Sequence, residues 1–171
     1  MGKNFFLVRN PTSFHDLSSY EKVIKDEVPN IDNTTLIYLK EAMQAFMSGC
    51  LLSSTVMLGV ATEHTFLLLM ETVDANTAHG PLFTGVSNER SILRKVNKSK
   101  KILDQNNSIV PSNVKEDLDT NFSGILSMIR SFRNESGHPS GKIISREQVY
   151  VLLHLFVSCC KKMYQLKDVF K

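Results

Sequence analysis

The chain has 171 residues, which is enough for one domain with a hydrophobic core and too few for two of ordinary size, so we expect a single domain over residues 1–171. Apolar residues make up 42% of the chain and charged residues 22%, and these proportions exclude a wholly disordered protein. Twenty Lys and Arg against seventeen Asp and Glu give a net charge of +3, which permits a polyanionic partner without requiring one.

The first part of the chain predicts little regular structure. Residues 1–32 contain Pro11 and Pro29 among scattered polar groups, so we expect an irregular lead-in with a short helix around "FHDLSSYEKVIKDEV". From Asn33 the pattern becomes helical. The stretch "NTTLIYLKEAMQAFMSG" begins with residues that cap helices and ends at Gly49, a residue that suits a helix C-terminus.

The most apolar stretch follows almost at once. "LLSSTVMLGVATEHTFLLLMETV", residues 51–73, is nearly long enough to cross a bilayer. Glu63 and His64 would then lie at the centre of the membrane, where charge is costly. We therefore expect a core helix of a soluble bundle and no membrane partner. Glu63 and His64 could approach a site on another helix, but a satisfied pair is the commoner role for such residues.

The next segment, "AHGPLFTG", is expected to break the chain at Gly80, Pro81 and Gly85. A third helix is then predicted from Asn88 to about Gln105. It carries the basic run "RKVNKSKK", which could follow a phosphate backbone, although a solvated helix face is the commoner meaning of such a run.

A fourth helix is predicted after the loop "NNSIVPSN". Ser112 or Asn113 can cap it, and it runs through "VKEDLDTNFSGILSMIRSF". Gly137 and Pro139 are the residues expected to end it.

The last helix is predicted to start near Ser145, whose spacing to Gln148 fits a capping box. Its apolar positions recur at helical spacing, and three more residues widen the apolar face beyond one stripe: Leu155, Val157 and Cys159. The wide face indicates either burial on several sides or a dimer contact. The whole pattern predicts an all-α bundle of four or five helices with a helical core over residues 33–169.

The three cysteines, Cys50, Cys159 and Cys160, are odd in number and lack the CxxC spacing of a zinc or redox site. With no signal peptide recognised, we expect a reducing, cytoplasmic location.

The stretch "RSFRNESGHPSG", residues 130–141, has two interpretations. An arginine in a last helical turn, followed by glycine and proline, is an ordinary way to end a helix, and Arg130 would only extend the basic helix face. The spacing of an arginine and a histidine is also weak evidence for an active site by itself. The segment "RNPTSFH", Arg9 to His15, has the same spacing and lies inside the irregular lead-in. The second match differs in lying between two strongly periodic helices.

In that setting Arg133, Asn134 and His138 match the RNxxxH form of a known signature. The chain resembles the HEPN superfamily (higher eukaryotes and prokaryotes nucleotide-binding domains), whose motif lies at the junction of the last two core helices. The resemblance covers roughly residues 33–169. It implies a metal-independent endoribonuclease, often of toxin–antitoxin or antiviral systems, that acts on RNA as a homodimer with two motifs facing one another. Toxin members are opposed by an antitoxin protein.

The residue types suit this chemistry on their own terms. A histidine with an ordinary pKa of about 6.5 can transfer protons near neutral pH. The guanidinium of Arg133 can stabilise charge that develops on a phosphate, and Asn134 can orient His138 or donate to phosphate. We expect no metal or other cofactor, because no HExxH motif, carboxylate cluster or Cys/His ligand spacing is found. One chain offers one such histidine for two proton-transfer roles, which predicts a homodimer.

Two other functions stay open. Some members of the superfamily have lost cleavage and only bind nucleotides, RNA or a protein partner, and the motif alone does not separate them from the enzymes. Less strongly, "GPL" before an arginine-bearing helix resembles the mannitol operon repressor group, which would imply a helical transcriptional regulator.

Overall fold

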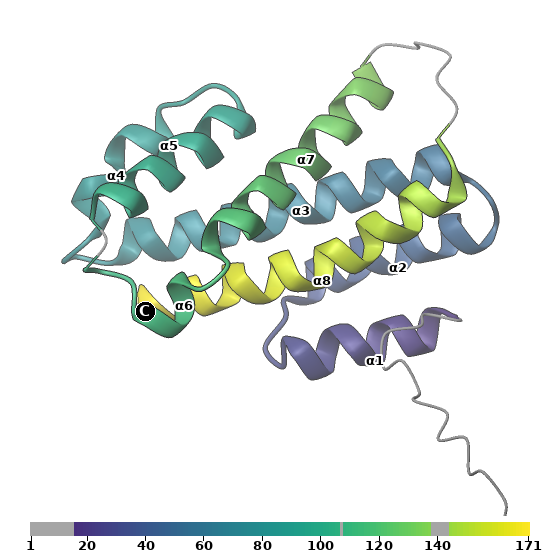
Figure 1. The fold of residues 1–171 in the computed structure, drawn as a ribbon, viewed down its shortest axis with the longest axis horizontal. Helices are drawn as coiled ribbons and strands as arrows, with labels where there is room; N and C mark the ends of the chain where they lie inside the picture. Colours follow the sequence, from purple (N-terminus) through teal and green to yellow (C-terminus); the bar gives the residue numbers. More distant parts are fainter. Residues whose placement is uncertain (1–15, 107, 138–143) are drawn as a thin grey trace, which may run out of the picture.

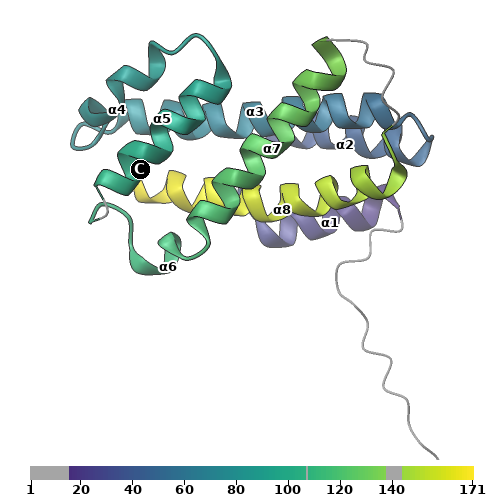
Figure 2. The same ribbon diagram turned by 45° about the horizontal axis from the view of Figure 1, so that its top comes forward.

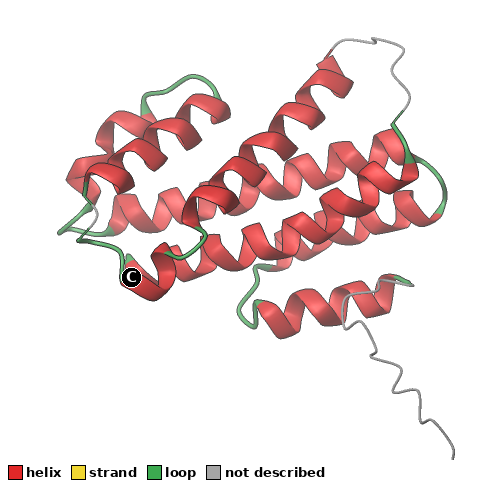
Figure 3. Ribbon diagram, in the orientation of Figure 1, coloured by secondary structure: helices red, strands yellow, loops and turns green. Residues whose placement is uncertain are grey.

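The structure is a computed structural model that describes residues 16–106, 108–137 and 144–171, with the helical backbone alone for residues 131–137. These residues form eight α-helices and no strand (Figure 3), which confirms the expected all-α fold. The five longest helices match the predicted ones, and short helices raise the number above the expected four or five. The helices are α1 (Leu17–Glu27), α2 (Asn33–Met47), α3 (Leu51–Ala75), α4 (Gly80–Ser87), α5 (Ile92–Gln105), α6 (Ser112–Lys115), α7 (Leu118–Gly137) and α8 (Arg146–Val169).

Three long helices, α2, α3 and α8, run side by side along the long axis of the molecule, and α7 crosses them obliquely (Figures 1 and 2). Helix α3 contacts α2, α7 and α8, so it is the central helix of the bundle. Helix α1 packs against α2 and α8, while α4 packs on α3 and α5 packs on α4 and α7.

Capping residues set several of the helix boundaries. Helices α1, α2, α5 and α8 each follow a residue whose side chain accepts a hydrogen bond from a backbone N–H three residues further on; these residues are Asp16, Asp32, Ser91 and Ser145. The capping box predicted for Ser145 and Gln148 is confirmed. At the end of α2, Gly49 has a φ of 76°, the left-handed conformation that ends many helices, as expected.

Helix α1 lies in the segment expected to be an irregular lead-in. The predicted short helix is confirmed, and it belongs to the packed core, because Tyr20 and Ile24 are buried. The Tyr20 hydroxyl donates to the carbonyl oxygen of Leu153 in α8 at 3.1 Å. The core therefore begins before Asn33.

The segment "AHGPLFTG" interrupts the chain less than expected. Only residues 76–79 separate α3 from α4, and Gly80, Pro81 and Gly85 all lie in α4, which corrects the predicted loop. Proline fits the first turn of a helix because no backbone N–H is needed there. Gly80 is required by space, since a Cβ atom at this position would lie 2.8 Å from the carbonyl oxygen of Val73.

The fourth predicted helix is divided into α6 and α7. The division lies at Asp117, whose φ of 58° interrupts the helical path. In α8, the buried ammonium of Lys162 donates to the carbonyl oxygens of Val114 at 3.1 Å and Glu116 at 2.7 Å. These carbonyl groups are thus satisfied by a distant side chain rather than by a continuing helix.

Helix α8 uses its wide apolar face inside the chain. Val157 and Cys159 are buried and Leu155 is partly buried, because α1, α3, α6 and α7 all contact this helix. A Cβ atom at Gly124 of α7 would lie 2.9 Å from Sγ of Cys159, so glycine permits the close crossing of α7 and α8. Of the two explanations offered for the wide face, burial on several sides accounts for it.

Helix α3 is long and apolar enough to cross a membrane by length and composition, and half of its most apolar window is buried inside the protein. It packs against α2, α4, α7 and α8 in the bundle.

Candidate functional site

The predicted motif begins on the last turns of α7. Arg133 and Asn134 are part of this helix, whose backbone is helical as far as Gly137, and this confirms the predicted end of the fourth helix. The side chains of Arg133 and Asn134 lie outside the described residues, as does all of His138. His15, from the first match, lies outside them too. The spacing of the three motif side chains therefore stays a prediction.

Described residues fix the helices on both sides of the motif. The end of α7, the start of α8 and the α2–α3 connection lie at the same end of the bundle (Figures 1 and 2). Nη1 of Arg146, the first residue of α8, donates to the carbonyl oxygen of Phe46 at 2.9 Å, and its guanidinium lies 4.1 Å from the centre of the Phe46 ring. The start of α8 is thereby attached to the end of α2.

One turn further along α8, the rings of Tyr150 and His154 lie 4.3 Å apart. Nδ1 of His154 is 2.9 Å from the carbonyl oxygen of Tyr150, and a carbonyl oxygen only accepts, so this nitrogen carries a proton. In neutral His154, Nε2 is then the acceptor nitrogen.

Among the secondary candidates, His64 has a partner that lies far from it in sequence. Its Nε2 is 2.9 Å from Oδ2 of Asp32, the residue that caps α2. The backbone N–H of Asp32 in turn donates to the hydroxyl of Tyr164 at 2.7 Å. His64 is therefore satisfied by a partner that the sequence did not predict, Asp32.

These contacts shift two pKa values. Burial acts to raise the pKa of Asp32, but hydrogen bonds from the backbone N–H of Thr35 and from His64 outweigh it, so the pKa lies below its ordinary value. Burial raises the pKa of Tyr164 to about 12, so its hydroxyl stays protonated. This hydrogen-bond network has a structural role, because it joins α2, α3 and α8.

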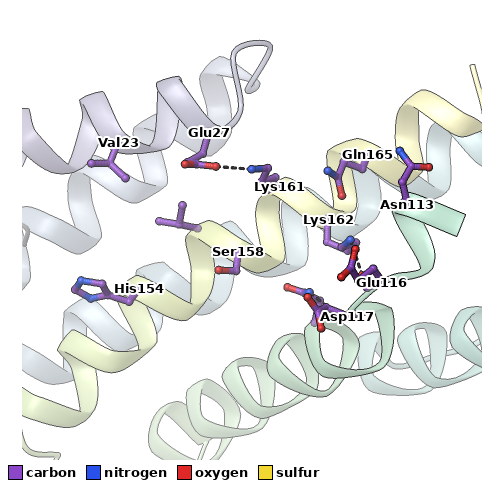
Figure 4. A pocket seen from close by; sticks show the side chains of 12 residues that line it. Val23, Glu27, Asn113, Glu116, Asp117, His154, Ser158, Lys161, Lys162 and Gln165 are labelled. Carbon is purple, nitrogen blue, oxygen red and sulfur yellow. Dashed lines mark hydrogen bonds and ion pairs between the residues drawn. The ribbon is translucent and has the colours of Figure 1, made fainter. Parts of the chain in front are cut away.

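A pocket of about 530 Å³ opens between α1, α6 and α8 (Figure 4). Its charged groups are largely satisfied from within the chain. Nζ of Lys161 lies 2.6 Å from the Glu27 carboxylate, and Lys162 donates to the backbone of α6 as described above.

The remaining charged groups of this pocket are carboxylates, and Asn113, Asn121, His154 and Ser158 also line it. Within the described residues, the carboxylates of Glu116 and Asp117 make no ion pair, and the buried Oε1 of Gln165 has no hydrogen-bond partner. Phosphate is negatively charged as well, so the Glu116 and Asp117 carboxylates disfavour an RNA backbone in this pocket.

Metal-ligating side chains of the described residues are not gathered in any one place. Within residues 16–106, 108–137 and 144–171, no group of three or more His, Cys, Asp or Glu is placed to hold a metal ion. Cys159 and Cys160 are buried, and burial raises the pKa of each thiol to about 12. Cys50 is exposed.

The chain shows no match to a protein-family model, to a curated protein or to a solved structure. Sequence reasoning missed the Asp32–His64–Tyr164 network and the bond from Lys162 to α6, because both join residues from distant parts of the chain. The capping aspartate before α2 was the one local signal of the former.

Proposed function

We propose that the chain is a metal-independent endoribonuclease of the HEPN type, in which Arg133, Asn134 and His138 form the active site together with the same residues of a second copy. The observation that carries the proposal is the position of the motif. Arg133 and Asn134 lie on the last turns of α7, and α8 is the next helix along the described chain. This is the junction at which the resemblance places the catalytic residues.

The proposed roles follow from the side chains. His138 accepts the proton of an RNA 2′-hydroxyl, which then attacks the adjacent phosphorus, and the histidine of the second copy protonates the departing 5′-oxygen. Arg133 stabilises the negative charge that develops on the phosphate oxygens. Asn134 orients the histidine or donates to a phosphate oxygen. The products are a 2′,3′-cyclic phosphate and a 5′-hydroxyl, so atoms and protons balance without a metal.

The scaffold around the motif supports this proposal. Helices α7 and α8 both pack along α3, and Arg146 attaches the start of α8 to α2. A catalytic group placed between two anchored helices loses less orientation than one on a free tail. Toxin or phage-defence activity in the cytoplasm is the biological setting that we propose with it.

Incubation of the purified protein with mixed RNAs in EDTA tests the proposal. We expect fragments that carry 2′,3′-cyclic phosphate ends, and none with the His138→Ala variant prepared in the same way. Fragments that appear only when a divalent ion is added would contradict a metal-independent reaction.

The rival is a non-catalytic RNA-binding module of the same fold. The concentration of positive charge on α5 supports RNA binding by either the module or the enzyme, so it does not separate the two. RNA that is bound but stays intact in EDTA would support the module.

A further inference from the structure

The positive charge of the protein is concentrated on one helix. Helix α5 carries five of the 20 Lys and Arg and one of the 17 Asp and Glu. The rest of the chain then has 15 basic and 16 acidic residues, which is close to neutral. The net charge of +3 therefore comes from α5.

Three of the five basic side chains in the run are used inside the protein. Lys98 pairs with Glu89 at 3.0 Å, and Lys95 donates to the carbonyl oxygen of Ser87 at 3.0 Å. Lys100 pairs with both Asp104 and Asp119, at 3.1 and 2.5 Å. These lysines attach α5 to α4 and α7.

The outward face of α5 is different. Arg94 and Lys101 are exposed, Arg90 is exposed just before the helix, and none of the three makes an ion pair within the part of the chain that the structure describes. Arg94 and Lys101 are two helical turns apart, which places them about 10 Å apart along the axis. We call these three residues the α5 ridge.

The residues around the α5 ridge favour a negatively charged polymer over a lipid surface or a protein partner. The apolar face of α5 packs inside the protein, with Ile92, Val96 and Leu103 buried and Leu93 and Ile102 partly buried against the core, so it is not presented to a lipid surface. The other exposed positions of α5 are Asn97, Asp104 and Gln105, and the Asp104 carboxylate pairs with Lys100. A protein partner usually needs aromatic or aliphatic anchors, which this face lacks.

We propose that the α5 ridge binds the sugar–phosphate backbone of the RNA whose cleavage is proposed above, at a distance from Arg133. The proposal rests on that function for its choice of polymer. Lys100 contacts Asp119 at the start of α7, and Arg133 lies 14 residues further along the same helix, about 21 Å by helical rise. An RNA that runs from this start of α7 to Arg133 spans roughly six nucleotides at the duplex spacing of ~3.4 Å per strand.

The test is RNA binding by matched variants. The binding variant is R90Q/R94Q/K101Q, and the control K22Q/K25Q/K40Q removes the same charge from α1 and α2, away from α5 in both views (Figures 1 and 2). Each is made in the His138→Ala background, and binding of a labelled single-stranded RNA of roughly 20 nucleotides is measured by fluorescence anisotropy across salt concentrations.

We expect the binding variant to lose affinity by at least about tenfold near 0.1 M salt, with a slope of log K against log salt shallower by about 2, since each lost phosphate contact removes about 0.7 on a single strand. The control should stay within about twofold. Circular dichroism checks that both variants are folded, and if the triple variant does not fold, R94Q/K101Q takes its place with an expected slope change of about 1.4.

Three results would overturn the α5 ridge: no binding of RNA by the parent protein, equal losses in the variant and the control, or binding to phosphatidylserine vesicles without binding to RNA. The endoribonuclease has its own readout. Salt-dependent RNA binding through α5, without fragments that carry cyclic phosphate ends, would support the α5 ridge and contradict the endoribonuclease. RNA cleavage by the R90Q/R94Q/K101Q protein with unchanged rate and affinity would support the endoribonuclease and contradict the α5 ridge.

Discussion

Oδ2 of Asp32 lies 2.9 Å from Nε2 of His64, and the same oxygen accepts the backbone N–H of Thr35 at 2.9 Å. One carboxylate therefore caps α2 and holds α3 against it. Replacing Asp32 with alanine removes both contacts at once.

We expect Asp32→Ala to lower the free energy of unfolding by about 1–3 kcal/mol, the range of a lost helix cap with a lost hydrogen bond to a charged group. Urea denaturation measures the change. Asp26→Ala is the matched control, because Asp26 is exposed and makes no ion pair within the described residues, and it should change stability by less than about 0.5 kcal/mol. Equal effects of the two substitutions would remove the role given to Asp32.

The pH dependence of stability should show the same carboxylate. The pKa of Asp32 is lower in the folded protein than its ordinary value of about 3.9, so its ionised form stabilises the fold above that pH. The contribution is lost as the pH falls through the lower, folded pKa. In urea midpoints measured from pH 6 to pH 2, the gap between the parent protein and Asp32→Asn should be constant above about pH 5 and should shrink below about pH 4. A gap that widens toward low pH would contradict this.

Thiol labelling checks the packing of α8. At pH 8 the folded protein should react quickly with Ellman's reagent at one of its three cysteines, Cys50, because Cys159 and Cys160 are buried with pKa values raised to about 12. All three should react in denaturant. Cys50→Ser should abolish the fast reaction, and rapid labelling of two or three thiols in the native protein would mean that α8 is not packed as described.

The sharpest activity prediction concerns the motif. His138→Ala should lower RNA cleavage on the order of a hundredfold or more, the usual contribution of a proton-transfer group, with an unchanged circular dichroism spectrum. Arg133→Lys should also reduce cleavage strongly, since lysine does not reproduce a two-pronged phosphate contact. His15→Ala, from the other arginine–histidine match, is the control and should cleave normally. Equal rates for the two folded histidine variants would return "RNESGHP" to an ordinary helix end.

A homodimer is expected because two proton-transfer roles need two copies of His138. Light scattering at micromolar concentration should give about twice the mass of the chain, 19.3 kDa. A purely monomeric protein that still cleaves RNA would contradict the two-copy site. The apolar face of α8 lends no support here, since its residues pack inside the chain.

Local signals in the sequence were enough to predict most of the long helices. Gly49 ends α2 and Ser145 with Gln148 begins α8 because a cap depends only on residues within one turn. Pro81 led to the wrong prediction of a loop, because the sequence does not distinguish a proline in the first turn of a helix from a proline in a loop.

Long-range contacts account for what the sequence did not predict. The break at Asp117 accompanies a lysine 45 residues further along the chain, and the partner of His64 lies 32 residues before it. Both separations are too long for local patterns in the sequence to predict these contacts. At the candidate site, the sequence predicted the helix that carries Arg133, while the arrangement of the motif side chains remains a prediction.

The hydrogen bonds from Lys162 also make α6 depend on α8. A helix of four residues is far too short to hold itself together in water, and the side chain that satisfies its carbonyl groups belongs to α8. The structure of α6 therefore depends on α8 being in place, so we expect the two segments to lose their structure together.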